Sequence, residues 1–437
     1  MKQDIIDFLK NKRILILGYG REGRSALNFI QTNLPDAEYA VADQNKVQLE
    51  NVQTYCGANY LDAVKDYDLI IKSPGIPTHD FIAADQLPKI TSLTDLFLRF
   101  CKNIVIGITG TKGKSTTSSL THHILKTANK NSVLAGNIGT ACFDIIDQLQ
   151  EDTIIVFEIS CHQLEFITAS PKIAVLLNLY EEHFDHYAKP EDYFTAKKNI
   201  YKYQSPEDTL IYGDIFQHAS REEIAHLPMH KINLLEDDIA DESEIHTHLI
   251  GQHNLTNIRA AIAACEAVGL NKSEILPAIE SFRGLPHRLQ FVGEYKNIQF
   301  YNDSIATAQE AVISAVKALK NVDTLLLGGM DRGLNYQELV DFLKQSSVRN
   351  IILLPETEQV FQRIFNETPF SQNLIPVANM DEAVKIAYQI TAENHICLLS
   401  PAAASYNTYK NFEERGDDFM NAVRRYQKWP KKDSWYF

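Results

Sequence analysis

Residues 103–117 read Asn-Ile-Val-Ile-Gly-Ile-Thr-Gly-Thr-Lys-Gly-Lys-Ser-Thr-Thr, an apolar run of strand length that ends in a glycine-rich turn. From Lys114 to Ala128 the apolar side chains recur at helical spacing. The start of a helix presents unpaired backbone N–H groups and the positive end of the helix dipole, and both attract phosphate. This stretch therefore predicts a strand, a phosphate-binding turn and a helix, in that order.

The residues of this turn have the chemistry that a nucleoside triphosphate requires. Gly110 and Gly113 allow the backbone to approach a phosphate closely, and Lys114 adds a positive charge. The hydroxyl of Ser115 or Thr116 can coordinate Mg²⁺. A glycine turn that only joins a strand to a helix is the alternative, but Gly-Lys-Ser-Thr in this setting favours a nucleotide site.

The composition is that of an acidic globular protein. The chain has 437 residues, which suggests roughly two to four domains. Its 45% hydrophobic and 22% charged residues provide ordinary globular cores. The net charge of −14 argues against a nucleic acid or an anionic membrane as partner, since neither attracts an acidic surface. Anionic substrates must then be held by local basic groups and helix ends.

The cysteines and the first residues bear on localisation. The 6 cysteines include no Cys-x-x-Cys pair, and we interpret them as free thiols in a reducing cytosol. The start of the chain lacks a signal-peptide pattern, and no apolar segment reaches the length that spans a membrane. We therefore expect a cytoplasmic protein, and we expect it to be a monomer.

A second glycine motif lies near the start of the chain. Residues 13–30 predict a strand, the turn Gly18-x-Gly20-x-x-Gly23 and a helix, and Asp43 follows about twenty residues later. Taken alone, this pattern favours an NAD-dependent oxidoreductase. Because the same turn can hold the pyrophosphate of any nucleotide, the motif does not identify its ligand.

Polar groups also end three further apolar runs. A turn at residues 73–75 follows one run, Glu158 interrupts the run at 153–159, and His183 follows a strand predicted over 173–179. In open α/β sheets, ligands bind at the carboxyl ends of the strands. A carboxylate at the end of a buried strand is costly unless it meets a cation, so Glu158 is predicted to bind Mg²⁺; pairing with a neighbouring base is the alternative. His183 would lie at the same edge of the sheet.

Three stretches resemble the Mur ligase family and its folylpolyglutamate synthase relatives. They are the loop at residues 109–116, the pattern Asn-Leu-x-x-x-His-x-Asp-x-Tyr at 178–187 and the string Gly-Gln-His-Asn-Leu-Thr-Asn at 251–257. The loop departs from the usual P-loop spacing, because Ile108 stands where a glycine is expected. That variant spacing is part of the resemblance, which implies ATP as a substrate.

The resemblance assigns roles to individual residues around ATP. It implies catalytic roles for Lys114, His183 and Lys197, and it implies that two magnesium ions are held by Ser115, Glu158, His183 and Lys197. Lys112 replaces the Asn, His or Ser usual in such loops, and we expect it to face solvent. Contact with ATP is implied for Gly110, Thr111, Lys112, Gly113, Lys114, Ser115, Thr116, Asn254, Asn257, His287, Arg288 and Asp303.

In the family, the lysine that corresponds to Lys197 is carbamylated and ligates magnesium. A bare ammonium would repel Mg²⁺, whereas a carbamate is an anionic oxygen donor of the type that Mg²⁺ prefers. Carbamylation needs an unprotonated amine, which a desolvated site favours. On a helix, Lys197 shares a face with Tyr193 and Phe194, while Lys198 points about 100° away. We therefore predict that Lys197 is the modified residue.

The resemblance also implies two further substrates, UDP-N-acetylmuramoyl-L-alanine and D-glutamate. Residues 400–416 resemble the segment that holds the incoming amino acid in the family member that adds D-glutamate. Ile305 and Arg332 each replace a lysine usual in the family; we expect Ile305 to be tolerated and Arg332 to bind a carboxylate bidentately. Substrate binding is implied for Gly20, Arg21, Asp43, Ser73, Pro74, Gly75, Asn137, Thr307, Arg332, Ser405 and Phe412.

Alternating strand and helix signals predict an α/β fold. With the resemblance, we expect a Rossmann-like domain for the UDP-sugar over residues 1–101, a central P-loop ATPase-like domain with a parallel sheet over 102–284, and a Rossmann-like amino-acid-binding domain over 285–437. The implied activity is ATP-dependent amide-bond formation through an acyl phosphate, in peptidoglycan precursor synthesis. Another Mur ligase, a folylpolyglutamate synthase-like ligase and a non-catalytic nucleotide-binding regulator are alternatives. An NAD-dependent oxidoreductase would leave Lys114 and Glu158 without a purpose.

Overall fold

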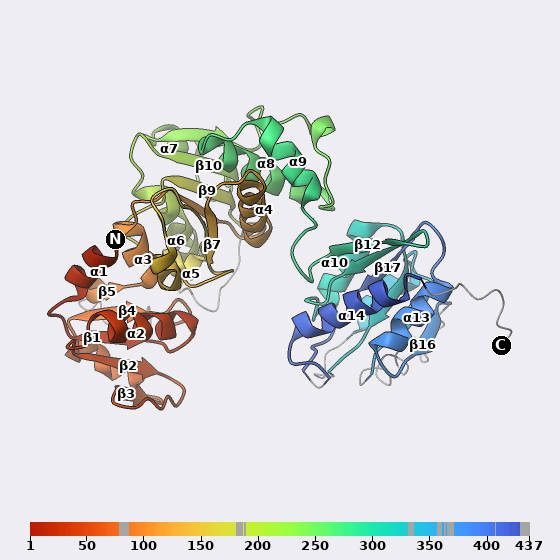
Figure 1. Ribbon diagram of the computed structural model, residues 1–437, viewed down its shortest axis with the longest axis horizontal. Helices are drawn as coiled ribbons and strands as arrows, with labels where there is room; N and C mark the ends of the chain where they lie inside the picture. The colour runs from red at the N-terminus through yellow and green to blue at the C-terminus, as the bar shows by residue number, and fades with distance from the viewer. Residues whose placement is uncertain are drawn as a thin grey trace. The chain divides into compact units, whose positions relative to one another are not determined.

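The computed structural model describes residues 1–77, 87–180, 187, 189–330, 336–355, 361, 364, 371–406 and 408–428. The chain forms two compact units (Figure 1). The first comprises Met1–His246 and Gln252–Ser281, and the second comprises Thr247–Gly251 and Phe282–Phe437. Both contain sheets of mainly parallel strands with helices around them, so the α/β class expected from the sequence is confirmed.

The first sheet of the first unit is parallel throughout. Its elements are α1 (Lys2–Leu9), β1 (Ile14–Leu17), α2 (Arg21–Asn33), β2 (Tyr39–Asp43), β3 (Gln53–Cys56), β4 (Leu69–Lys72), β5 (Ile90–Thr91) and α3 (Leu93–Phe100). The strand order is β3-β2-β1-β4-β5, and every residue of β1 is buried. The order changes direction beside β1, which is where open α/β sheets bind ligands, outside the carboxyl ends of the strands.

The second sheet of the first unit is also parallel. Its elements are β6 (Val105–Thr109), α4 (Lys114–Thr127), β7 (Ser132–Gly136), β8 (Ile154–Glu158), α5 (Cys161–Leu164), β9 (Ile173–Asn178), α6 (Pro190–Lys202), β10 (Thr209–Asp214), α7 (Arg221–Ala225), β11 (His230–Asn233), α8 (Gln252–Ala267) and α9 (Lys272–Ser281). The strand order is β11-β10-β9-β6-β8-β7. Helices α4 and α8 pack against each other and on β6–β10, while α6 packs on β6 and β9. The predicted strand, turn and helix at residues 103–128 are thus confirmed.

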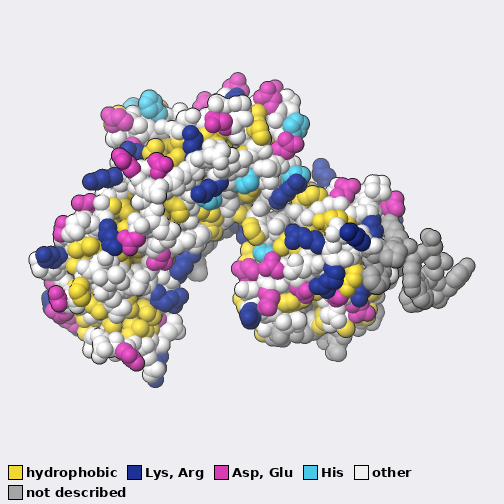
Figure 2. Space-filling model, in the orientation of Figure 1, with side chains coloured by type: hydrophobic (Ala, Val, Ile, Leu, Met, Phe, Trp, Pro, Cys, Tyr) yellow, Lys and Arg dark blue, Asp and Glu magenta, His cyan; other side chains and the backbone are white. Residues whose placement is uncertain are grey.

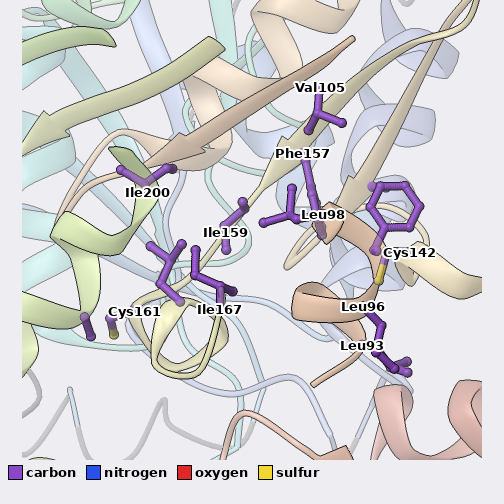
Figure 3. Close-up of a cluster of buried hydrophobic side chains, with 14 of the residues drawn as sticks. Leu93, Leu96, Leu98, Val105, Cys142, Phe157, Ile159, Cys161, Ile167 and Ile200 are labelled. Atoms are coloured by element: carbon purple, nitrogen blue, oxygen red, sulfur yellow. The ribbon is translucent and has the colours of Figure 1, made fainter. Parts of the chain in front are cut away.

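One hydrophobic core extends from the first sheet into the second. It includes Ile16 of β1 and Leu176 of β9, and helix α3 lies between them in the sequence. Figure 3 shows part of this core, with Leu96 of α3 and Phe157 of β8. The ring of Phe97 meets the ring of Phe157 edge to face, with the centroids 5.4 Å apart. This shared core explains why both sheets belong to one compact unit, although each sheet falls in its own predicted domain range.

The third sheet lies in the second unit. Its elements are β12 (Gln290–Tyr295), β13 (Ile298–Asn302), α10 (Gln309–Leu319), β14 (Val322–Leu327), α11 (Gln337–Lys344), β15 (Asn350–Leu353), β16 (Asn373–Pro376), α13 (Met380–Ile390), β17 (His395–Leu399) and α14 (Phe412–Tyr426). The order is β12-β13-β17-β14-β15-β16. Leu325 and Leu327 face a core with α10 and α11, whereas Leu326 faces a core with α13 and α14. The alternation follows from the period of two along a strand.

The third sheet departs from a fully parallel Rossmann-like sheet at one edge. Strands β12 and β13 pair antiparallel, and the other pairs are parallel. The connection between them is the pair Lys296 and Asn297, with φ of 55° and 58°. Positive φ at both central residues is typical of the type I′ turns that close two-residue hairpins. Because the turn lacks a glycine, no hairpin was expected here from the residue pattern.

The surface carries charges of both signs. On the face seen in Figure 2, acidic and basic side chains are interspersed over both units. The whole chain has 56 Asp and Glu residues against 42 Lys and Arg residues. Within the part of the chain that the structure describes, no helix combines the length and the apolar character needed to cross a membrane. An acidic surface of this kind requires local basic groups or helix ends wherever an anion is to bind.

We expect position 23 to accept no side chain. A Cβ atom on Gly23 of α2 would lie 1.9 Å from the carbonyl oxygen of Gly18, in the turn that follows β1. Gly23→Ala should therefore lower the free energy of unfolding by about 3 kcal/mol, the upper end of the usual cost of overpacking. Chemical denaturation of the variant and the wild type measures this difference.

Gly75→Ala is the matched control, because a Cβ atom on Gly75 would have no heavy atom within 4 Å. This variant should unfold within about 0.5 kcal/mol of the wild type, as surface substitutions usually do. Equal losses of stability in Gly23→Ala and Gly75→Ala would show that the approach of Gly23 to Gly18 does not constrain the fold.

Candidate active site

The phosphate-binding turn lies between the end of β6 and the start of α4. Gly113 precedes Lys114 with a φ of 88°, a conformation that residues with side chains rarely adopt. A Cβ atom on Gly113 would lie 2.2 Å from Oδ1 of Asn257 in α8. Both the backbone conformation and the close neighbour require glycine here.

Strand β9 and helix α6 hold this turn in place. The backbone N–H of Lys112 donates to Oδ1 of Asn178 (2.9 Å), and Nδ2 of Asn178 donates to the carbonyl of Lys112 (3.1 Å). The hydroxyl of Thr111 accepts from the N–H of Tyr180 (3.0 Å) and shares a hydrogen bond with the hydroxyl of Tyr193 (3.0 Å). The side-chain amide of Asn178 therefore pairs with the backbone of Lys112 through two hydrogen bonds, as the backbone of a neighbouring strand would. Asn178 was not among the predicted site residues, although its position at the end of a predicted strand could have indicated it.

Lys114 turns back over the loop that precedes it. Its Nζ donates to the carbonyl oxygens of Gly110 and Thr111, each at 2.9 Å. Ser115 and Thr116 are half-buried in the first turn of α4, and Lys112 is exposed, as expected. The ammonium group therefore lies where the backbone of the loop and the helix start converge.

The structure distinguishes the two adjacent lysines of α6. Lys197 is 1% exposed, its Nζ lies 4.9 Å from the centre of the Tyr193 ring, and it donates to the carbonyl of Gly110 (2.9 Å). Lys198 has a side chain that is 23% exposed and forms an ion pair with Glu223 (2.9 Å). The expected shared face of Lys197 and Tyr193 is confirmed, and only Lys197 of the two contacts the phosphate-binding turn.

Glu158 ends β8 next to the start of the same turn. It is fully buried and pairs in register with Ile108 of β6. Its Oε1 accepts from Nδ2 of Asn137 (2.7 Å), whereas its Oε2 has no hydrogen-bond partner among the described residues. A buried carboxylate oxygen without a partner is costly, and a hard cation would relieve that cost. Glu158 therefore fits a magnesium ligand, while His183 lies outside the described residues.

Two asparagines of α8 that the resemblance assigns to ATP, Asn254 and Asn257, lie near the start of α4. Asn257 is 4% exposed, and its Oδ1 accepts from the hydroxyl of Thr117 in α4 (3.3 Å). Its Nδ2 donates to Oδ1 of Asn254 (2.8 Å), which orients the second side chain. The side-chain amide of Asn257 therefore lies at the start of α4, with its Oδ1 next to Gly113 of the phosphate-binding turn.

The glycine turn after β1 is fixed by residues that were expected to bind substrate. Asp43 accepts from the N–H of Tyr19 (2.7 Å), and the hydroxyl of Ser73 donates to the carbonyl of Gly18 (2.9 Å). Asp43 ends β2 and Ser73 follows β4, so these contacts hold the turn from the two strands that flank β1. Gly20 is the N-cap of α2, and Pro74 and Gly75 follow Ser73 at the same edge.

Arg21 joins this edge of the first sheet to the second sheet. Its guanidinium donates to the carbonyl oxygens of Gly136 (2.6 Å) and Asn137 (3.1 Å), in the turn after β7. Asn137 in turn donates to Glu158, so Arg21 and Asn137 link the first glycine turn to the buried carboxylate. Arg21 was expected to bind substrate, and this contact could not be predicted from local sequence because it joins positions more than 100 residues apart.

In the second unit, His287 and Asp303 lie at adjacent loops. His287 is 6% exposed, and its Nδ1 accepts from Nδ2 of Asn302 (3.0 Å); burial lowers its pKa below the usual histidine value. Asp303 accepts from the N–H of Leu289 (3.1 Å) and the hydroxyl of Ser400 (2.8 Å). Arg288 and Thr307 are exposed and Ile305 is half-buried.

A pocket in the second unit contains one of the residues expected to bind the amino acid. Ser405 lines it and is 5% exposed, together with Tyr409 and Arg415. Phe412 begins α14, and its carbonyl accepts from the hydroxyl of Ser304 (2.8 Å). Arg332 lies outside the described residues. Arg415 was quoted within a motif but not assigned to the site, and its burial could not be read from the sequence.

The carboxyl of Asp303 makes part of the stability dependent on pH. Burial raises the pKa of Asp303 to about 6, above the usual value of about 4 for the unfolded chain. A raised carboxyl pKa favours the folded state while the group is protonated. This contribution is complete below about pH 4 and is lost as the pH rises through about 6.

Asp303→Asn removes this titration and keeps the shape of the side chain. Its free energy of unfolding relative to the wild type should rise by about 2 kcal/mol between about pH 4.5 and pH 7.5. Urea unfolding of both proteins at the two pH values measures the change. A difference between the two proteins that does not vary with pH would contradict a raised pKa at Asp303.

Residues 108–265 match the family described as Mur ligase middle domain. Among solved structures, a UDP-N-acetylmuramoyl-L-alanyl-D-glutamate–2,6-diaminopimelate ligase has a TM-score of 0.58 at 16% identity, covering 94% of this chain and 92% of that one. The MurF ligase of Thermotoga maritima in complex with ADP has a TM-score of 0.52 at 15% identity, with coverage of 97% and 96%. These likenesses establish the fold.

Relatives of higher identity match along almost the whole chain. The UDP-N-acetylmuramoylalanine–D-glutamate ligase of Listeria monocytogenes serovar 1/2a is 32% identical over 448 aligned positions, which cover 96% of this chain and 97% of that protein. The protein of the same name from Bacillus thuringiensis strain Al Hakam is 33% identical, with coverage of 95% and 98%. The chain therefore belongs to the Mur ligase family.

Proposed function

We propose that this protein is an ATP-dependent ligase that joins D-glutamate to UDP-N-acetylmuramoyl-L-alanine in peptidoglycan precursor synthesis. The observation that carries the proposal is the phosphate-binding turn at Gly110–Lys114, with Glu158 and Lys197 buried against it. The named relatives, at 32% and 33% identity over nearly the full chain, supply the substrates. The carboxylate of the alanine residue is the acceptor of the γ-phosphoryl group of ATP.

The reaction has two balanced steps. A carboxylate oxygen attacks the γ-phosphorus of ATP, the bond from that phosphorus to the bridging oxygen of ADP breaks, and an acyl phosphate forms. The neutral amine of D-glutamate then attacks the acyl carbon, the amine loses a proton, and inorganic phosphate leaves. Phosphorylation is needed because an oxide ion is a poor leaving group, whereas phosphate is a good one.

The residues of the turn would act mainly by positioning and by neutralising charge. Lys114 and the N–H groups at the start of α4 would hold the phosphates in line with the attacking carboxylate. Magnesium would be held by Ser115, Glu158, His183 and a carbamylated Lys197. Negative charge that develops on the transferred phosphoryl group would be neutralised by bound Mg²⁺, which is the chemistry that the metal supplies.

The substrates would occupy the edges that the three sheets present. The UDP-sugar is assigned to the glycine turn after β1, with Gly20, Arg21, Asp43 and the turn at residues 73–75. The remaining ATP contacts are assigned to Asn254, Asn257, His287, Arg288 and Asp303, and D-glutamate to Thr307, Arg332, Ser405 and Phe412. We retain the division into three domains at residues 1–101, 102–284 and 285–437, and a cytoplasmic monomer, as parts of this proposal.

Phosphate release from ATP tests the proposal. Purified protein should release phosphate with UDP-N-acetylmuramoyl-L-alanine and D-glutamate, and much more slowly with other amino acids in a panel. Preference for a different amino acid would indicate another Mur ligase. No release with any acceptor would contradict ligase activity, and Ile305 would be the first position to restore to lysine.

Lys114→Ala should reduce phosphate release by at least about 1,000-fold while the protein stays folded, because removing a preorganised charge costs several kcal/mol of transition-state stabilisation. Lys126→Ala is the matched control, since Lys126 is exposed in the last turn of the same helix. The control should keep the activity of the wild type. A folded Lys114→Ala variant with near-normal phosphate release would refute the assignment of the turn.

Carbamylation of Lys197 can be tested without relying on activity. Burial favours an uncharged amine, which reacts with CO₂ to give a carbamate and a proton. The carbamate nitrogen keeps one N–H, so the hydrogen bond from Lys197 to Gly110 can persist. ¹³C NMR of the protein with ¹³C-bicarbonate should show a carbamate signal in the wild type.

Lys198→Ala is the control, because Lys198 pairs with Glu223 on the surface. The carbamate signal and bicarbonate-dependent activity should remain in Lys198→Ala and disappear in Lys197→Ala. A signal that survives in Lys197→Ala, or one that is absent from active wild-type protein, would rule out the modification at this position.

A further inference from the structure

Arg415 is a fully buried cation held by neutral groups. It lies in the first turns of α14 and is 1% exposed. Its Nε donates to the hydroxyl of Ser304 (3.0 Å), and its Nη2 donates to the carbonyl of the same residue (2.7 Å). Its Nη1 donates to the carbonyl oxygens of Ala403 (2.9 Å) and Ala404 (3.2 Å). The guanidinium therefore joins the loop after β13 to the loop after β17.

Within the described residues, no carboxylate forms an ion pair with Arg415. Asp418 of the same helix accepts from the hydroxyl of Tyr409 (2.8 Å), and Glu414 accepts from the N–H of Lys410 (2.6 Å). Burial lowers the pKa of Arg415 to about 10, which leaves the guanidinium charged at neutral pH. A buried charge with only neutral partners is costly to the fold, and an arriving anion would offset part of that cost.

The guanidinium forms part of the wall of the pocket that contains Ser405. Gly329, Thr408 and Tyr409 also line this pocket, and its volume is about 60 Å³. That is room for about four water molecules, or for a carboxylate group of similar size. A Cβ atom on Gly329 would lie 2.9 Å from Nη1 of Arg415, so glycine at this position leaves the space beside the cation open.

Four of the five N–H groups of Arg415 are used within the protein. The remaining N–H, on Nη2, has no acceptor among the described residues, so a ligand that reaches Nη2 from the pocket can accept one hydrogen bond there. A charge-assisted hydrogen bond of this kind favours a carboxylate over an uncharged amide of the same shape. Because the surroundings are buried, the effect of the charge is also larger than it would be in water.

We propose that Arg415 supplies the positive charge by which this pocket selects an incoming amino acid with a carboxylate side chain. The proposal rests on the ligase function proposed above and concerns its choice of amino acid. Arg415 acts as a specificity-determining residue, and its four hydrogen bonds also position Ser304 and Ala403–Ala404. A purely structural clamp is the competing explanation, and it predicts no preference between charged and neutral side chains.

The test compares D-glutamate with its neutral isostere D-glutamine. The measured quantity is the ratio of kcat/KM for the two amino acids, from phosphate release with UDP-N-acetylmuramoyl-L-alanine and ATP. Arg415→Gln should reduce the preference for D-glutamate by about 10- to 100-fold, the range expected for one hydrogen bond to a charged group, mainly through KM. Arg415→Lys keeps the charge and should keep most of the preference.

Arg424→Gln is the matched control, because Arg424 is exposed on the same helix and its loss changes the net charge equally. This variant should show the wild-type ratio. Equal losses with D-glutamate and D-glutamine in Arg415→Gln, with the ratio unchanged, would overturn the proposal in favour of the structural clamp.

A measurement on the wild type covers the case in which Arg415→Gln does not fold. A buried charge is poorly screened by salt, so the preference for D-glutamate should change by less than about 3-fold between about 0.05 M and 0.5 M NaCl. A preference that falls about 10-fold or more over this range would assign selection to an exposed cation and overturn the proposal.

The outcome for the ligase function is separable from the outcome for Arg415. A wild type that prefers another acidic amino acid would correct the substrate but support the role of Arg415, provided that Arg415→Gln loses that preference. A wild type that prefers a neutral amino acid would contradict both.

Discussion

Parallel strands bring their carboxyl ends to one edge of a sheet, and the candidate active site depends on this constraint. Strand β6 lies between β8 and β9, so the phosphate-binding turn is next to Glu158 on one side and Asn178 on the other. Helix α6 then contributes Lys197, which contacts the carbonyl of Gly110. Strand order therefore brings together residues that are distant in the sequence. The chemistry of the turn depends on side chains from β8, β9 and α6 as well as on its own residues.

Three buried charged side chains lie near the proposed ligands. Glu158, Lys197 and Arg415 are each 0% or 1% exposed. Among the described residues, Glu158 accepts from Asn137, and Lys197 and Arg415 donate to backbone carbonyl groups. Buried charges lower the stability of the folded state, and the apolar cores that enclose the sheets must offset that cost. We infer that these charges serve binding: Glu158 and Lys197 toward magnesium and phosphate, and Arg415 toward the incoming amino acid.

Local patterns predicted much of the fold and part of the site. The strand, turn and helix around Lys114 followed from an apolar run, glycines and helical spacing, and helical geometry distinguished Lys197 from Lys198. The sequence could not reveal the contact of Arg21 with Gly136 and Asn137, since only the packing of two sheets brings them together. It also gave no sign that Arg415 is buried, and the hairpin at Lys296 lacks a glycine signal. His183 and Arg332, two residues of the predicted site, lie outside the described residues.

We propose that the carboxylate of the acceptor is activated as an acyl phosphate at the turn of Gly110–Lys114. The most direct test is to label both carboxylate oxygens of UDP-N-acetylmuramoyl-L-alanine with ¹⁸O and to analyse the phosphate released by mass spectrometry. One oxygen of the carboxylate must leave with the phosphate when the amine displaces it, so each phosphate should carry one ¹⁸O atom. Phosphate without ¹⁸O, or ¹⁸O in released AMP, would contradict activation of the carboxylate as an acyl phosphate.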